Sequence, residues 1–103
     1  MKRLIFSDQA VADLIGIADY ITDISSHDEV GNRFAEEIEI HCRKLARLPG
    51  LLGRNRPELS EGLRSIPHKS YLIFFRYRDD IFEVVTIIGA ERDLDAYFAE
   101  AKI

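Results

Sequence analysis

The chain has 103 residues, of which 47% are hydrophobic and 31% charged, and its formal net charge is −4. This length suits one domain with a single core, residues 1–103, and the composition excludes an intrinsically disordered protein. The longest apolar runs, such as Tyr71–Phe75, have five residues. Because a membrane-spanning helix needs roughly 20 apolar residues, we expect no membrane segment.

The N-terminal segment MKRLIFSDQA and the single cysteine, Cys42, bear on location. The segment holds too few apolar residues before Ser7 to serve as a secretory signal. One cysteine excludes an internal disulfide, so a reducing cytoplasm is the expected location.

Charge is distributed unevenly along the chain. Residues 43–78 hold nine Lys/Arg against two acids, a net charge of +7, whereas the segments on both sides are acidic. A concentrated basic surface usually has an anionic partner. Nucleic acid, an acidic protein segment, or both in turn are therefore candidate partners.

The first half of the chain predicts a short strand and a helix. Arg3–Phe6 is short, has three apolar residues after Arg3 and is followed by Ser7, a pattern typical of an edge strand that ends at a helix N-cap. From Asp8 to about Asp23, apolar residues recur at three- and four-residue spacing, which predicts an amphipathic helix.

A second and longer helix is predicted to begin at Ser26, which forms a capping box with Glu29. Its apolar stripe ends at Pro49-Gly50, where proline and glycine stop the helix. Because only a few polar residues join the two helices, we expect an antiparallel hairpin.

The second half predicts strands after an irregular connection from Leu51 to Gly62. The predicted elements are strands Leu63–Lys69, Tyr71–Arg78 and Ile81–Ile88, a turn at Asp79-Asp80, and a short helix from about Leu94 to Ala101. The whole order predicts an α+β domain. An N-terminal strand and an antiparallel helix hairpin would pack on a small antiparallel sheet with a three-stranded C-terminal meander.

Alternation along Tyr71–Arg78 assigns the two faces of the middle meander strand. Its odd residues are all apolar or aromatic and are expected to face the hairpin. The even residues, which include Arg76 and Arg78, are expected to face solvent or a partner. Leu72 and Phe74 would then form an apolar patch beside positive charge, as on a docking surface.

Side chains that could carry chemistry are few. His68 could act as a general base or be an ordinary surface histidine, and Cys42 lies on the predicted buried stripe. His27 and His41 do not match a zinc spacing, and no glycine-rich loop has the Lys-Ser/Thr of a phosphate site. We therefore expect no metal and no cofactor.

Four segments, together with two motifs in the first predicted helix, carry a family resemblance. The resemblance covers nearly the whole chain. They are Leu52-Gly53-Arg54-Asn55-Arg56-Pro57-Glu58-Leu59, Gly62-Leu63-Arg64-Ser65-Ile66, Tyr71-Leu72-Ile73-Phe74-Phe75-Arg76 and Gly89-Ala90-Glu91-Arg92-Asp93-Leu94. With Ala12-Asp13-Leu14 and Ile17-Ala18-Asp19-Tyr20-Ile21, this chain resembles the ParE branch of the RelE/ParE toxins.

The resemblance implies a toxin of a type II toxin–antitoxin system with the fold described above. It implies a ParD-like antitoxin as partner, whose extended C-terminal segment wraps the toxin and holds it inactive. ParE-type members block DNA gyrase, so gyrase is the expected target, and DNA is met only through gyrase or the antitoxin.

RelE-type relatives instead cut messenger RNA on the ribosome. They place an arginine on the middle meander strand where this chain has Leu72, and a further cation on the last strand, where Val84–Ile88 has none. Tyr97 is the only late aromatic candidate for acid–base catalysis. The pattern favours a binding toxin without catalytic residues.

Two alternatives stay open. One is a ribosome-dependent endoribonuclease of RelE type that uses His68 and neighbouring arginines, and the other is a family member that binds its antitoxin but is no longer toxic. The candidates for binding the target or the antitoxin are Arg54, Arg56, Arg64, His68, Lys69, Leu72, Phe74, Arg76, Arg78 and Arg92.

Overall fold

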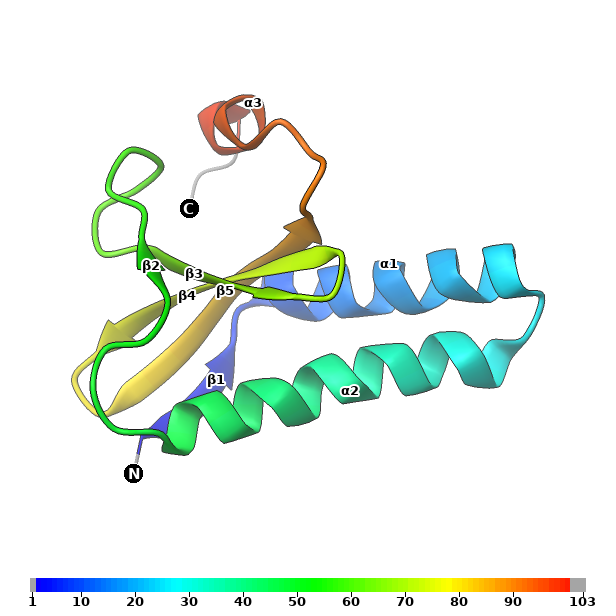
Figure 1. Ribbon diagram of the computed structural model, residues 1–103, viewed down its shortest axis with the longest axis horizontal. Helices are drawn as coiled ribbons and strands as arrows, with labels where there is room; N and C mark the ends of the chain where they lie inside the picture. Colours follow the sequence, from blue (N-terminus) through cyan, green and yellow to red (C-terminus); the bar gives the residue numbers. More distant parts are fainter. Residues whose placement is uncertain (1, 101–103) are drawn as a thin grey trace.

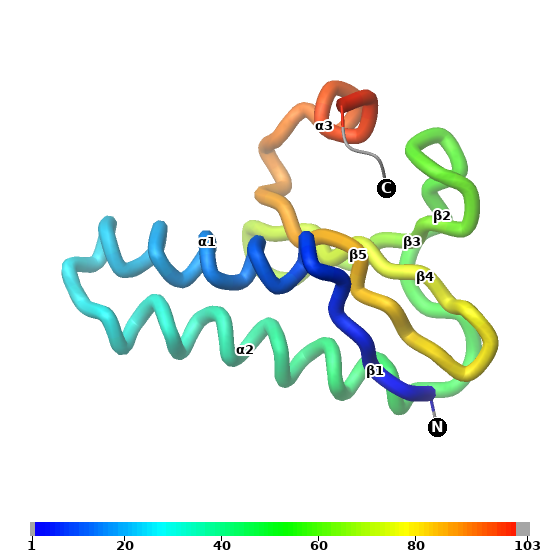
Figure 2. The backbone as a smooth tube through the Cα atoms, turned by 180° about the vertical axis from the view of Figure 1, so that it is seen from behind, coloured from blue at the N-terminus to red at the C-terminus, as the bar shows by residue number. Residues whose placement is uncertain are grey.

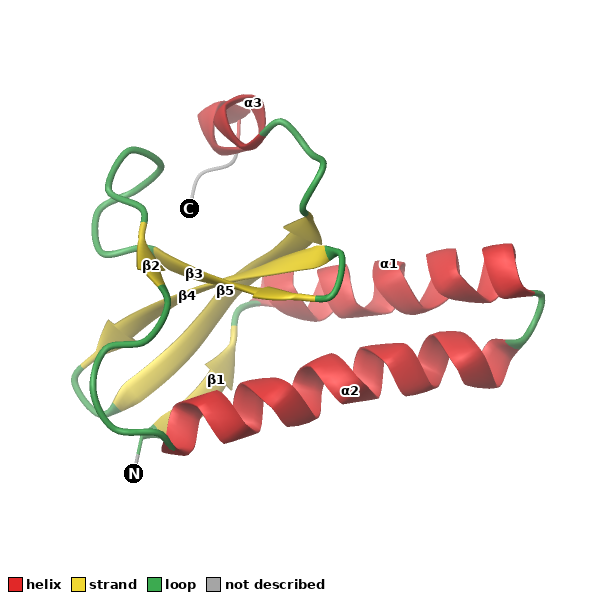
Figure 3. Ribbon diagram, in the orientation of Figure 1, coloured by secondary structure: helices red, strands yellow, loops and turns green. Residues whose placement is uncertain are grey.

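A five-stranded sheet carries a long helix hairpin on one face and a short helix on the other (Figures 1 and 3). The computed structural model describes residues 2–100. Its elements are β1 (Arg3–Phe6), α1 (Asp8–Ser25), α2 (Asp28–Arg47), β2 (Arg54–Asn55), β3 (Arg64–His68), β4 (Tyr71–Arg78), β5 (Ile81–Gly89) and α3 (Leu94–Glu100). The predicted α+β class is confirmed, and the end of the predicted third helix at Ala101 lies outside the described residues.

The strands lie in the order β1-β5-β4-β3-β2. Strands β2 to β5 pair antiparallel, as the predicted meander requires, but β1 pairs parallel with β5. The sheet is therefore mixed rather than purely antiparallel. The two-residue β2 was not predicted, because so short a strand leaves no alternation in the sequence.

The start of α1 is confirmed at Ser7, whose hydroxyl oxygen accepts a hydrogen bond from the Ala10 N–H at 3.0 Å. The predicted capping box at Ser26 is wrong. Ser26 instead ends α1 in the left-handed region, with φ 62° and its N–H bonded to the Thr22 carbonyl. Because only Ser26 and His27 separate the helices, Ser26 cannot also take the extended conformation of an N-cap, and His27 occupies that position.

Both faces of the sheet bury a core. The larger cluster lies between the sheet and the hairpin and includes Ile38, Cys42 and Phe75, with the Phe75 ring stacked on Phe82 at 4.6 Å. A smaller cluster on the other face consists of Leu63, Phe74, Val85 and Ile88, with side chains of α3 packed against it.

An irregularity in the pairing of β4 with β5, between Phe74 and Phe75, leaves Val85 without a partner residue on β4 and shifts the alternation of β5 by one residue. Val84 and Ile87 contact the hairpin cluster, whereas Val85 and Ile88 contact the smaller cluster. Because both faces of β5 are covered, all five residues from 84 to 88 are buried.

The hairpin extends well beyond the sheet (Figures 1 and 2). Its two helices approach closely at Gly31, where a Cβ atom would collide with the Ala18 carbonyl and the Thr22 side chain. No helix within residues 2–100 has both the length and the apolar character required for a membrane span.

We predict opposite effects for two helical glycines. Gly31→Ala adds a methyl group where the partner backbone already lies, so we expect a loss of about 1–3 kcal/mol in the free energy of unfolding. Gly16→Ala adds the same group where nothing lies within 4 Å, so better helix propensity should stabilise by up to about 1 kcal/mol. Urea denaturation of both variants measures the difference; equal effects would contradict the close contact.

Candidate functional site

Four of the predicted arginines share the face of the sheet that carries α3. Arg54 pairs with Ser65 across β2 and β3, and Ser65 pairs with Phe74 across β3 and β4, so these side chains point to one side. Arg76 and Arg78 follow Phe74 at two-residue steps along β4. The Arg56 side chain reaches the same side, because its Nε donates to Ser65 Oγ at 2.8 Å. We call Arg54, Arg56, Arg76 and Arg78 the arginine face.

Two arginines of this face are engaged within the protein. Arg76 donates to Ser60 Oγ at 2.5 Å and to the Glu61 carbonyl at 3.3 Å. The Arg56 side chain is only 15% exposed and lies 3.7 Å from the Glu58 carboxylate. Both side chains therefore tie the segment 56–61 to the sheet.

Arg64 lies on the opposite, hairpin-facing side of β3 and holds the start of the same connection. Its Nε donates to the Leu52 carbonyl at 2.6 Å, and its Nη2 donates to the Gly53 carbonyl at 3.1 Å. Arg64 is thus separated by the sheet from the arginine face. Arg54 and Arg78 are the two exposed members of that face, and the Arg78 side chain is 61% exposed although it lies 3.6 Å from Glu83.

His68 and Lys69 lie at the other end of β3 and contact α2. The His68 ring packs on His41 with centroids 4.7 Å apart, and the Lys69 ammonium lies 2.9 Å from the Glu37 carboxylate. Lys69 Nζ also lies 5.1 Å from the centre of the Phe34 ring. These two residues therefore fasten the β3–β4 turn to the hairpin and do not join the arginine face.

Burial and neighbouring cations disfavour the charged form of both histidines. Desolvation lowers the pKa of His68, Lys69 lowers it further, and Glu37 opposes them. Desolvation also lowers the pKa of His41, and His68 and Lys44 add to this effect. In contrast, the hydrogen bond from Lys69 lowers the pKa of Glu37 and so favours its carboxylate. The His68 Nε2 atom is buried without a hydrogen-bond partner among the described residues.

The expected apolar patch of Leu72 and Phe74 is not exposed. Phe74 is fully buried, with its ring 5.0 Å from Phe98, and Leu72 is half-buried beside it. The prediction of exposure failed because α3 and Leu59 cover this part of the even face. Neither side chain is a free anchor for a partner in this conformation.

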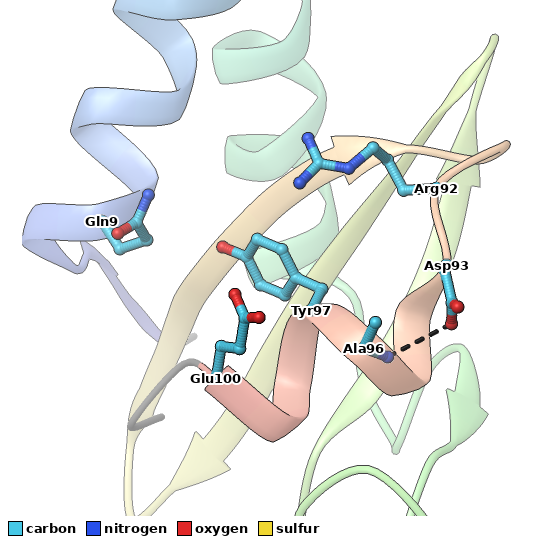
Figure 4. Close-up of a pocket in the computed structure, with 6 residues that line it drawn as sticks. All are labelled: Gln9, Arg92, Asp93, Ala96, Tyr97 and Glu100. Carbon is cyan, nitrogen blue, oxygen red and sulfur yellow. Dashed lines mark hydrogen bonds between the residues drawn. The ribbon is translucent and has the colours of Figure 1, made fainter.

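Arg92 lines a depression between α1 and α3 of about 450 Å³ (Figure 4). Its guanidinium lies 5.6 Å from the centre of the Tyr97 ring. The Tyr97 hydroxyl lies 2.9 Å from Thr86 Oγ1, which in turn donates to the Asp13 carboxylate at 2.5 Å. Because the single Thr86 proton is directed to Asp13, the Tyr97 hydroxyl donates to Thr86. The linked side chains join α1, β5 and α3.

Sequence reasoning noticed Tyr97 but not this connection, since Asp13 and Thr86 lie 73 positions apart. The buried position of Cys42 is confirmed, and desolvation raises the pKa of its thiol to about 12. Such a thiol is not a nucleophile near neutral pH. No cluster of three or more His, Cys, Asp or Glu within residues 2–100 is arranged to hold a metal ion.

Comparisons with known proteins agree with this architecture. The family model described as "ParE toxin of type II toxin-antitoxin system, parDE" matches residues 4–94. A solved structure titled "Chromosomal ParDE TA system from P. aeruginosa" has a similar fold, with a TM-score of 0.74 and 22% identity. The match covers 88% of this chain and 98% of that one. No curated protein sequence matches the chain significantly.

The fold and the family match define a toxin of a type II toxin–antitoxin system. The chain belongs to the ParE toxin family of ParDE systems.

The histidine pair predicts a stability that depends on pH. Because both folded pKa values lie below the ordinary value of 6.5, the unfolded chain binds more protons near pH 6. Their contribution is therefore fully present above about pH 6.5 and is lost as the pH falls through the folded pKa values. We expect the free energy of unfolding to decrease over this range, measured by urea denaturation at a series of pH values.

The variant His41→Phe keeps an aromatic ring but removes one titrating group, so the pH dependence should become shallower. His27→Gln is the matched control, because His27 lies at the start of α2 away from this pair. Identical profiles for the parent chain and His41→Phe would contradict the assignment.

Truncation of the even-face residues separates a core role from a surface role. Phe74→Ala empties a fully buried site, so we expect a loss of about 3–5 kcal/mol in the free energy of unfolding. Leu72→Ala should cost less, because Leu72 is already partly exposed. Chemical denaturation measures both losses. A loss below about 1 kcal/mol for Phe74→Ala would indicate that Phe74 is exposed, as the alternation alone predicted.

Proposed function

We propose that this ParE-family chain inhibits DNA gyrase by binding in the cytoplasm, without catalytic residues of its own, and that a ParD-like antitoxin neutralises it. The family match over residues 4–94 carries this proposal. The arginine face supplies the target-binding charge, with Arg54 and Arg78 as its accessible members.

The internal contacts support two different roles for the basic residues, one structural and one in binding a partner. Arg56 and Arg76 hold the segment 56–61 in place, so their removal would disturb the surface as well as its charge. Arg54 and Arg78 are better placed to touch a partner, because replacing them removes few internal contacts. An acidic antitoxin segment over the same face would compete with the target through charge complementarity.

The nuclease alternative receives less support from the arrangement of its groups. His68, its proposed general base, packs on His41, on the side of β3 away from the arginine face. Tyr97, the other acid–base candidate, directs its hydroxyl to Thr86. His68 is thus separated by the sheet from Arg54 and Arg78, where a phosphate would be held, and the Tyr97 hydroxyl is already engaged by Thr86.

A supercoiling assay with purified gyrase tests the proposal. The parent protein should inhibit supercoiling, and Arg54→Glu combined with Arg78→Glu should weaken inhibition by about tenfold or more, since both changes reverse exposed charge. Arg33→Glu combined with Lys44→Glu is the matched control, because it makes the same two charge reversals at exposed positions of the hairpin. We expect it to inhibit like the parent.

Unimpaired supercoiling at excess toxin would overturn the proposal. Site-specific cuts in translated messages after induction, lost in His68→Ala, would instead establish the nuclease alternative. Normal growth after induction without antitoxin would indicate a member that has lost its toxicity.

A further inference from the structure

Strand β1 leaves one side of its backbone free. It lies at the edge of the sheet and pairs only with β5 among the described strands. The N–H groups of Arg3 and Ser7 point to β5, where they donate to Asp80 and Val84 at 2.7 and 2.9 Å. Because backbone groups alternate along a strand, the N–H groups of Leu4 and Phe6 point away from the sheet.

A groove lies between this edge and the C-terminal half of α2, which run close together (Figure 2). Its volume is about 430 Å³. Leu4, Phe6 and Ala46 form its apolar part, so its floor suits the side chains of an extended peptide.

The rim of the groove is basic. Lys2, Arg43 and Arg47 line it together with a single acid, Glu39, which is bonded to Arg43 at 3.1 Å. One carboxylate thus faces three cations, and exposed Arg3 lies at the start of the same strand. The groove therefore favours a ligand with negative charge.

We propose that β1 accepts an extended acidic segment of a protein partner, which adds to the sheet as a sixth strand. The free backbone groups of Leu4 and Phe6 would form the new ladder. Alternate side chains of the segment would enter the apolar part of the groove, and its carboxylates would face Arg43 and Arg47.

The same features disfavour other occupants. A second copy that pairs edge to edge would offer its own β1 segment, whose charged residues Lys2 and Arg3 are both cations, so it would bring no carboxylate to the basic rim. A nucleic acid would use the cations but would leave the alternating N–H and C=O groups of the edge without partners. An acidic peptide satisfies both the backbone and the charge.

This site is separate from the arginine face. Strand β1 is one edge of the sheet and β2, which carries Arg54, is the other. Binding of an acidic segment at β1 therefore does not require gyrase to be the target, and it can be tested with neither gyrase nor the antitoxin present.

Amide hydrogen exchange of the full chain, followed by NMR, tests the site. The probe is the peptide acetyl-Glu-Val-Glu-Val-Glu-Val-amide, added in excess. We expect the Leu4 and Phe6 amides to exchange about tenfold more slowly when about nine-tenths of the protein is bound. The Ile5 amide, which already points to β5, should change little.

Two further peptides separate charge from backbone pairing. Acetyl-Lys-Val-Lys-Val-Lys-Val-amide should not protect Leu4 or Phe6, because its cations meet a basic rim. Acetyl-Glu-Val-Glu-Pro-Glu-Val-amide should bind more weakly than the parent peptide, because proline lacks an N–H for the ladder.

Charge reversal of the rim completes the test. Arg43→Glu combined with Arg47→Glu should weaken binding of the acidic peptide by about tenfold or more. The matched control is Lys44→Glu together with Arg33→Glu, since both positions are exposed on α2 but do not line the groove. It should bind within about threefold of the parent.

Three results would overturn the proposal. They are unchanged exchange at Leu4 and Phe6 in the presence of the acidic peptide, equal protection by the lysine peptide, and chemical shift changes confined to the arginine face. Protection of the two amides that rises with protein concentration, without any peptide, would assign the edge to a second copy instead.

Discussion

The fold depends on how the first turns of α1 complete the edge of β5. Strand β1 ends at Phe6, opposite Val84, so the part of β5 beyond Val84 has no strand on that side. The Ser7 hydroxyl donates to the Val85 carbonyl at 2.5 Å, and the Asp13 carboxylate accepts from the Ile87 N–H at 2.9 Å. Side chains of a helix thus replace the missing strand, because buried backbone groups left unpaired would be costly. The same Asp13 carboxylate accepts a hydrogen bond from the Thr86 hydroxyl. Because Thr86 is also bonded to Tyr97, the side chains that complete β5 hold α3 in place as well.

Once β5 is completed in this way, both of its faces can be covered. The hairpin covers one, and α3 with the segment 56–61 covers the other. Leu59 of this segment packs against the smaller cluster. Arg76 donates to the Ser60 hydroxyl and the Glu61 carbonyl of the segment, and Arg56, within it, donates to Ser65 Oγ on β3. Guanidinium groups suit this task, since they carry five donors and stay charged when partly buried. The basic composition of residues 43–78 is therefore partly structural, and only its exposed members are free for a partner.

The sequence predicted the order of the elements and the hairpin-facing side of β4, because both depend on the spacing of apolar residues along short segments. Ile73 and Phe75 are buried where alternation placed them. Local patterns could not show that α3 folds back over Phe74, since that contact joins residues 24 positions apart. They also could not show that the linker between the helices leaves no room for a capping box at Ser26. The basic residues were predicted as one surface for the same reason: neighbours in sequence were treated as neighbours in space, whereas the sheet separates Arg64 from Arg76.

The separation of the two basic surfaces constrains how a single partner would reach both. Four strand spacings lie between β1 and β2, which amounts to about 19 Å at ~4.8 Å per spacing. An extended chain covers about 3.3 Å per residue, so roughly six residues bridge this distance. A segment that pairs with β1 and continues past the sheet would therefore need only a short linker to place further carboxylates on the arginine face. Binding at the second surface would then be intramolecular, and modest affinities at the two surfaces would combine into a tight complex. A partner confined to the arginine face gains no such advantage from linked binding.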